Sequence, residues 1–332
     1  MEQAIKRDNK LDSIKGLLII LVVLGHSIES TSNEGFMRIL YNFIYSFHMP
    51  LFIFISGYFT NTTKGKIQFF DSVLNIFCTF IVFQIIRIVY LMITTNSISL
   101  HTIICPQWTL WYLLSVVYWR TLFYIISKKH SGIINFQIIL LCFVVSIVCG
   151  YIPIGNAFSI QRTLYYGTFF ALGLYFRNKQ LISKIYNTSN KTIILFFILS
   201  LLGIIIFQDK NINWLLYGNS AYSGWPINIT LCPIVRTAQF ILSCMICFLV
   251  ILFCPKISFL STLGKSTLFI YIYHSFIITF LNHFDNIGGG DFSTLLITLT
   301  TVIFSLLLMN KISFFHHLIE PYKYIKGIKK RG

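Results

Sequence analysis

A lysine and a histidine stand at the two ends of an apolar stretch near the start of the chain. Lys15 and His26 are eleven residues apart in the segment LDSIKGLLIILVVLGHSIES. Eleven residues make about three helical turns, so a helix here places both side chains on one face, roughly 16 Å apart along its axis. A lysine at a membrane surface can hold an anionic molecule, and a deeper histidine can act as an acid or a base. The alternative is that Lys15 is an interfacial flanking residue and that His26 packs in the core.

Two further histidines, His48 and His274, also lie in apolar segments. A single buried histidine usually has a packing role, whereas three at similar predicted depths indicate a metal site, a proton relay or an acid–base centre. Glu29 follows His26 by three residues and therefore shares its helical face, where it either orients the imidazole or lies at the membrane interface. We take His26, His48, His274 and Glu29 as the candidate catalytic residues. We expect no metal, since the Cys244-x-x-Cys247 pair lies in an apolar run without a nearby histidine and is typical of packing.

The composition predicts an integral membrane protein. The chain has 332 residues, of which 56% are hydrophobic and 11% charged, whereas a soluble domain carries about 25% charged residues. The net charge of +16 is divided among short clusters between apolar runs, which is typical of membrane topology and argues against a nucleic-acid partner. We therefore expect a polytopic all-α bundle in the cytoplasmic (inner) membrane, forming a single domain over residues 1–332 with no appended soluble domain.

Ten apolar segments are long enough to span a bilayer or nearly so. Twenty of the 26 basic residues fall in loops that alternate with basic-poor ones, so the positive-inside rule predicts that both termini are cytoplasmic. That result requires an even number of spans, which favours ten. The longest outer loop is expected at 209–229. The predicted segments are 14–31, 38–59, 70–95, 108–127, 132–150, 159–177, 192–208, 230–253, 266–283 and 293–313.

Arginines inside the apolar segments also indicate function. An arginine in the bilayer costs about 2.5–3.5 kcal/mol on an insertion scale, so such residues usually face a cavity or a partner. Arg120 can reach a surface by snorkelling, but Arg87 lies midway along its segment. Arg162 and Arg236 lie near the outer ends of theirs, where they can line an outward-facing cavity and bind hydroxyl-rich or anionic acceptors.

Several stretches resemble motifs of the acyltransferase 3 family of integral-membrane acyltransferases. The second of them most resembles the branch that contains fucose O-acetylase-like and other polysaccharide acetyltransferases. Ten spans with both termini inside is also the arrangement of that family. The matching stretches are LDSIKGLLIILVVLGHS, with Lys15 where the family commonly has arginine; YSFHMPLFIFISGYF around His48; WTLWYLLSVVYWR from Trp108 to Arg120; LGKSTLFIYIYHSFI with His274; and, more weakly, QRTLYYGTFFALGLYF around Arg162.

The resemblance implies transfer of an acyl group, usually acetyl, from cytoplasmic acyl-CoA to a hydroxyl of an extracytoplasmic glycan or lipid-linked oligosaccharide. His26 would act as general base or carry the acyl group covalently, while His48 and His274 would bind the thioester oxygen or relay the proton. The expected partners are acetyl-CoA or another acyl-CoA, the glycan acceptor and the bilayer. We assign donor binding to Lys15, Asp12, Lys64 and Lys66, and acceptor binding to Arg162, Arg236, Trp108 and Trp111.

The main alternative is a transporter or flippase for a glycan or a lipid-linked sugar. Such a protein would also place arginine and histidine in the membrane. It does not require a lysine and a histidine on one helical face, or the motif around His48. A purely structural membrane partner would leave the buried arginines unexplained.

Overall fold

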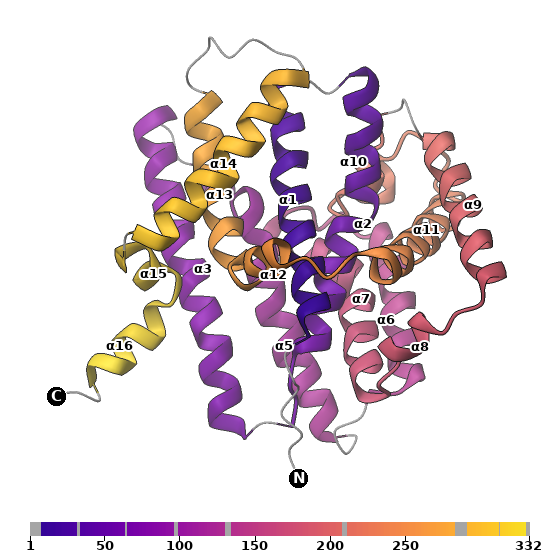
Figure 1. The fold of residues 1–332 in the computed structure, drawn as a ribbon, viewed down its shortest axis with the longest axis horizontal. Helices are drawn as coiled ribbons and strands as arrows, with labels where there is room; N and C mark the ends of the chain where they lie inside the picture. The colour runs from indigo at the N-terminus through magenta and orange to yellow at the C-terminus, as the bar shows by residue number, and fades with distance from the viewer. Residues whose placement is uncertain are drawn as a thin grey trace. The chain divides into compact units, whose positions relative to one another are not determined.

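The long helices of this chain coincide with the apolar segments that the sequence predicts. The computed structural model describes residues 8–31, 34–63, 65–95, 99–129, 134–207, 211–282, 291–311 and 313–329, and over these residues it contains helices, turns and no strand. Each of the ten predicted apolar segments contains a long helix (Figure 1), which confirms the all-α class for the described residues. These helices are α1 (Asn9–Thr31), α2 (Gly35–Phe59), α3 (Lys66–Thr95), α5 (Trp111–Lys129), α6 (Phe136–Val148), α7 (Ile160–Asn178), α9 (Asn190–Phe207), α11 (Cys232–Phe253), α13 (Thr267–Asn282) and α14 (Asp291–Lys311).

Five stretches of the described residues are long and apolar enough to cross a membrane, namely those of α1, α2, α3, α5 and α11. Shorter apolar helices lie within α6, α9, α13 and α14. The prediction of ten spans with cytoplasmic termini therefore stays a prediction. Short helices also occur in the connections: α4 (Leu100–Ile104), α8 (Ile182–Tyr186), α10 (Asn213–Leu216), α12 (Ser258–Lys265), α15 (Ser313–Ile319), α16 (Pro321–Lys329), and the 3-10 turns Trp108–Leu110, Cys149–Tyr151, Ala157–Ser159 and Tyr222–Gly224.

Contacts between Cα atoms divide the chain into two compact units. The first comprises residues 1–52, 183–209 and 242–305, and the second comprises 53–182, 210–241 and 306–332. Boundaries fall inside α2, α8, α11 and α14, so the residues of each of these helices are divided between the two units.

In the first unit, α1 and α12 pack with their backbones in contact (the indigo and orange helices of Figure 1). A Cβ atom on Gly16 would lie 1.9 Å from the carbonyl oxygen of Leu260, and one on Gly264 would lie 1.8 Å from that of Asp12. No other side chain fits at either position. Small residues at helix contacts are the usual way in which membrane helices approach closely. The contact fixes the position of α1 along α12.

A proline inside α2 is compensated by a neighbouring helix. Pro50 has no N–H, so it leaves the carbonyl oxygen of Ser46, one turn earlier, without its helical donor. The Ser243 hydroxyl of α11 donates to that oxygen at 2.5 Å, and the bond is buried. The missing backbone bond therefore becomes a side-chain bond that joins α2 to α11.

In the second unit, the end of α2 packs closely on α7. A Cβ atom on Gly57 would lie 2.2 Å from the carbonyl oxygen of Phe170, and one on Gly173 would lie 2.0 Å from that of Phe54. The C-terminal helix α16 docks on the first turns of α3 through polar contacts. Tyr322 donates to the Asp71 carboxylate at 2.8 Å, and Lys326 forms an ion pair with the same group.

The proline and serine pair predicts a thermodynamic cycle. Ser243→Ala should lower the free energy of unfolding by about 1–3 kcal/mol, because it leaves a buried carbonyl without a donor. Pro50→Ala should restore most of this loss in the double variant, because alanine at position 50 supplies the missing N–H. Reversible unfolding in mixed micelles measures all three variants. Ser146→Ala is the control, since that hydroxyl bonds only within its own helix. Additive losses in the double variant would refute the compensation.

The charge distribution predicts accessibility on opposite sides of the membrane. Ser223 is exposed in the segment expected outside, and Ser258 is exposed at the start of α12 in a segment expected inside. Ser223→Cys should react with an impermeant thiol reagent in intact cells, whereas Ser258→Cys should react only after permeabilisation. Mass-tagging of the purified protein measures both, with the parent protein as the blank. The reverse labelling pattern would show that the predicted topology is inverted, with Ser223 on the cytoplasmic side and Ser258 outside.

Candidate functional site

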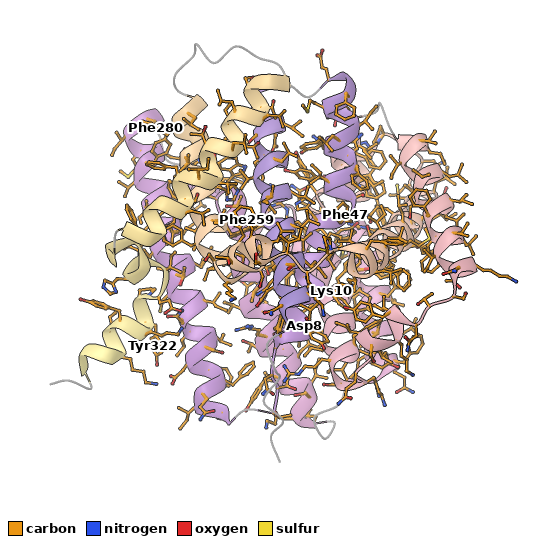
Figure 2. The ribbon with its side chains drawn as sticks, in the orientation of Figure 1. Asp8, Lys10, Phe47, Phe259, Phe280 and Tyr322 are labelled. Carbon is orange, nitrogen blue, oxygen red and sulfur yellow. The ribbon has the colours of Figure 1, made fainter. Side chains whose placement is uncertain are left out.

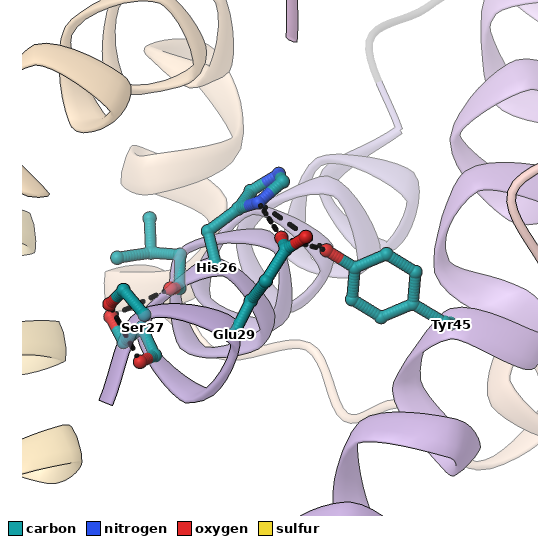
Figure 3. A network of polar contacts seen from close by, with 6 residues as sticks. His26, Ser27, Glu29 and Tyr45 are labelled. Atoms are coloured by element: carbon teal, nitrogen blue, oxygen red, sulfur yellow. Dashed lines mark hydrogen bonds and ion pairs between the residues drawn. The ribbon is translucent and has the colours of Figure 1, made fainter. Parts of the chain in front are cut away.

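The first unit gathers the predicted histidines around the C-terminal half of α1. His26 Nδ1 lies 3.2 Å from Glu29 Oε2 and 3.3 Å from the Tyr45 hydroxyl (Figure 3). The Tyr45 hydroxyl also donates to the same carboxylate oxygen, at 3.4 Å. Because a carboxylate only accepts, the proton of this contact belongs to His26 Nδ1. The Nε2 atom is then the position at which the neutral ring can accept a proton.

The other two histidines are fixed by their own helices. His48 Nδ1 donates to the Ile44 carbonyl oxygen at 2.8 Å, and His274 Nδ1 donates to that of Ile270 at 3.0 Å. A carbonyl oxygen only accepts, so each neutral ring carries its proton on Nδ1 and its lone pair on Nε2. Both side chains are fully buried in the protein. The hydrogen bonds therefore define one tautomer for each ring.

Ring contacts join these groups into one cluster. The His26 and His274 ring centroids are 5.3 Å apart. Tyr45 links His26 and His48, because its ring centroid is 6.2 Å from that of His26 and 4.7 Å from that of His48. An imidazole that a carboxylate orients can accept a proton from a hydroxyl group, and the carboxylate stabilises the charge that results.

Tyr45 is the member of this cluster that the sequence did not single out. It precedes His48 by three residues and therefore shares its face of α2, which is the signal that was available. Its ring also stacks on Tyr41, with the centroids 4.0 Å apart. The contact with His26 joins two helices, and no spacing within one helix could have indicated it.

The residues assigned to donor binding separate into different environments. Lys15 forms an ion pair with Asp12 at 2.7 Å; the Asp12 side chain is 3% exposed and that of Lys15 is 20% exposed. The lysine therefore neutralises a buried carboxylate at the packed end of α1. Lys66 is exposed at the start of α3, in the second unit. Lys64 lies outside the described residues.

Two of the residues assigned to acceptor binding, Trp108 and Trp111, each lie against an arginine in the second unit. The Arg162 guanidinium carbon is 5.0 Å from the Trp111 ring centroid, and that of Arg87 is 5.4 Å from the Trp108 ring centroid. Trp108 has a φ of 45°, a left-handed conformation that costs energy in a bulky residue. Both tryptophans lie at or just before the start of α5, and their guanidinium partners come from the second half of α3 and from the start of α7.

Arg236 has a different setting, because it is enclosed by aromatic rings. Its guanidinium carbon is 4.1 Å from the ring centroid of Tyr165, 5.3 Å from that of Tyr222 and 5.5 Å from that of Trp225. The residue is 1% exposed, and no carboxylate of the described residues forms an ion pair with it. Burial raises the pKa of the Tyr222 phenol, and this effect exceeds the lowering by the charge of Arg236. The phenol therefore stays neutral and donates to the Ile147 carbonyl oxygen. The ring faces supply the electrostatic attraction that a counter-ion would otherwise give.

Gly150 completes this enclosure. A Cβ atom there would lie 2.3 Å from Tyr222 Cζ and 2.7 Å from Arg236 Nη1.

Among the described residues, no three side chains of His, Cys, Asp or Glu are grouped so that they could hold a metal ion. Cys247 is buried, and its thiol points to the Phe47 carbonyl oxygen at 3.7 Å.

Comparisons with known proteins agree with the motifs. The family model for acyltransferase 3, described as an acyltransferase domain, matches residues 8–310. The nodulation protein NolL of Sinorhizobium fredii is 41% identical over 71 residues, which are 20% of this chain and 19% of the relative. The NolL protein of Mesorhizobium japonicum is 41% identical over 59 residues, 17% of this chain and 16% of the relative. The matched stretch thus spans less than a fifth of either relative, and no solved structure matches the chain.

The burial of the histidines predicts their reactivity. In detergent, a small reagent that acylates neutral imidazole should modify His26, whose side chain is 15% exposed, before His48 and His274, which are 3% and 0% exposed. Peptide mass spectrometry over a time course measures the order. His101, exposed on α4, is the positive control. Equal rates at His26 and His274 would contradict the arrangement of the cluster.

Proposed function

We propose that the chain, which belongs to the acyltransferase 3 family of membrane acyltransferases, moves an acetyl group from cytoplasmic acetyl-CoA to a hydroxyl of a glycan outside the cytoplasmic membrane. The observation that supports this reaction best is the contact of His26 Nδ1 with both the Glu29 carboxylate and the Tyr45 hydroxyl. An imidazole held in this way has the orientation and the charge partner that a general base requires.

In this reaction His26 Nε2 accepts the proton of the acceptor hydroxyl while the hydroxyl oxygen attacks the thioester carbon. The new C–O bond forms, the C–S bond breaks, and the proton passes from His26 to the CoA thiolate. Glu29 stabilises the imidazolium that exists between the two proton transfers. An acyl-imidazole on Nε2 is the alternative route. Rapid denaturation at neutral pH after mixing with labelled acetyl-CoA, without acceptor, distinguishes them, because only the covalent route leaves label on the protein.

The position of Lys15 supports the donor assignment. It lies about 16 Å along α1 from His26 and on the same face. In our proposal the phosphates of acetyl-CoA bind at this end, and the extended pantetheine arm carries the thioester to His26. An ammonium group offers three donors, so Lys15 can bind phosphate while it remains paired with Asp12.

The arginine and tryptophan pairs support a glycan acceptor. Sugar rings pack their C–H faces on aromatic side chains and direct their hydroxyls to charged donors. Trp108 with Arg87, and Trp111 with Arg162, combine both features. In our proposal these pairs bind the acceptor. Arg236 holds the rings of Tyr222 and Trp225, which belong to the segment 209–229 that is expected outside, in place.

One measurement tests the proposal against the transport alternative. The purified protein, reconstituted in vesicles, is given labelled acetyl-CoA outside and soluble glycan or lipid-linked oligosaccharide inside. Acetyl transfer to the glycan, with one CoA thiol released per acetyl group, would support the proposal. Movement of the glycan across the bilayer without CoA release would instead establish a transporter.

The catalytic assignment predicts graded losses. His26→Ala should lower the rate of acetyl transfer by about 10²–10⁴-fold at unchanged protein level, because the general base is lost. Glu29→Gln should lower kcat by about tenfold and leave KM for acetyl-CoA unchanged, because it weakens only the bond that orients the ring. Transfer is followed by thiol release and by NMR of the glycan. His101→Ala is the control. A His26→Ala variant with normal turnover would eliminate this centre.

The donor assignment predicts a charge requirement at position 15. Lys15→Ala alone would remove the ion-pair partner of the buried Asp12 carboxylate, which destabilises the fold. The double variant Asp12→Asn/Lys15→Gln instead keeps a neutral hydrogen-bonded pair. It should raise KM for acetyl-CoA by about tenfold with little change in the unfolding temperature, whereas Lys15→Arg should bind normally. Lys265→Gln is the matched control. Unchanged KM in the double variant would remove Lys15 from donor binding.

A further inference from the structure

An apolar groove with one basic end lies in the first unit, apart from the histidine cluster. It encloses about 630 Å³ between α1, α2, α9 and α11. Fourteen residues line it, and all except Ser200 and Cys254 have apolar side chains. Leu17 and Phe43 form one side, and residues of α9 and α11 form the other. A soluble ligand would find almost no polar partner here.

The length of the groove corresponds to one leaflet of a bilayer. Its lining on α9 runs from Ile193 to Ile204, which are eleven residues apart, or about 16 Å of helix. The lining on α11 runs from Ile246 to Phe253 and continues to Pro255. The hydrocarbon core of a bilayer is about 30 Å thick, so the groove covers about half of it. A single hydrocarbon chain that enters from one membrane surface fits this depth.

Basic side chains gather at the end of the groove that the charge distribution predicts to be cytoplasmic. Lys10 donates to the Leu252 carbonyl oxygen at 3.0 Å, and its ammonium nitrogen lies 4.1 Å from the Tyr186 ring centroid. Lys256 follows the lining residue Pro255 and is close enough to interact with the charge of Lys10. Figure 2 labels Lys10 and Asp8, a carboxylate whose charge acts on Lys10, at the start of α1. Lys191 is exposed two residues before Ile193.

The groove is not a route to the histidines. Leu17 precedes His26 by nine residues, which is two and a half helical turns, so the two side chains point from opposite faces of α1. Lys15 precedes Leu17 by two residues and also lies away from the groove face. The groove is therefore separate from the proposed donor path.

We propose that this groove binds one acyl chain of an anionic phospholipid of the inner leaflet, with the lipid phosphate held by Lys10 and Lys256. The Lys10 ammonium has three donors and uses one on Leu252, so two remain for phosphate oxygens. Basic pockets between membrane helices on the cytoplasmic side are a known chemistry for anionic lipid headgroups, and each lysine adds about 1 kcal/mol, or about fivefold in affinity. This inference does not depend on the proposed acyl transfer.

Native mass spectrometry of the delipidated full-length protein tests the site. Phosphatidylglycerol and phosphatidylcholine with identical chains are added separately, and undecaprenyl phosphate is added in a third series. We expect phosphatidylglycerol to bind at the lowest concentration. Lys10→Gln and Lys256→Gln should each reduce its preference over phosphatidylcholine by about fivefold. Lys265→Gln, which removes another exposed charge of the same region, should leave the preference unchanged.

A matched pair of leucines on α9 tests the chain-binding part. Leu201 lines the groove and Leu202 does not, and both are exposed, so the fold tolerates a larger side chain at either position. Leu201→Trp should lower binding of both phospholipids, and Leu202→Trp should not. Equal binding of the two phospholipids, a preference that both lysine variants retain, or normal binding by Leu201→Trp would each overturn the proposal. Tighter binding of undecaprenyl phosphate would also overturn it and identify an isoprenoid occupant.

Discussion

The contact between the backbones of α1 and α12 is the constraint on which the first unit depends. At Gly16 and Gly264, a carbonyl oxygen of the facing helix occupies the space that a side chain would need. The stability of such a contact comes from the close packing of the two backbones and from the absence of side-chain entropy to lose. Because α1 carries both Lys15 and His26, the same contact sets the position of both candidate groups relative to α12.

Charge in this protein is stabilised by different partners in different places. Lys15 has a carboxylate partner, Asp12, at the packed end of α1. Arg236 instead has three aromatic rings, which attract a cation without carrying a charge that must itself be desolvated. His48 and His274 need no counter-ion while neutral, and carbonyl oxygens of the preceding helical turn determine their tautomers.

Hydropathy was sufficient to predict every long helix, because lipid contact imposes long apolar runs that no other environment requires. The residue types and intrahelical spacing also identified His26 with Glu29, whose contact lies within one turn. Contacts between helices were not predictable, and Tyr45 was missed for that reason. The backbone compensation at Pro50 was missed as well, since its donor, Ser243, is almost two hundred residues away in sequence. The short helices of the connections were not predicted because they lack a complete apolar period.

The helical spacing between Lys15 and His26 has a consequence for how this gene can change. Many single replacements on the lipid-facing side of α1 would alter neither the separation nor the shared face. One inserted or deleted residue between the two positions would rotate His26 by about 100° relative to Lys15 and shift it by about 1.5 Å, even if the helix remained intact. Between Lys15 and His26, a change of residue type is therefore tolerable outside the Gly16 contact, whereas a change in the number of residues is not.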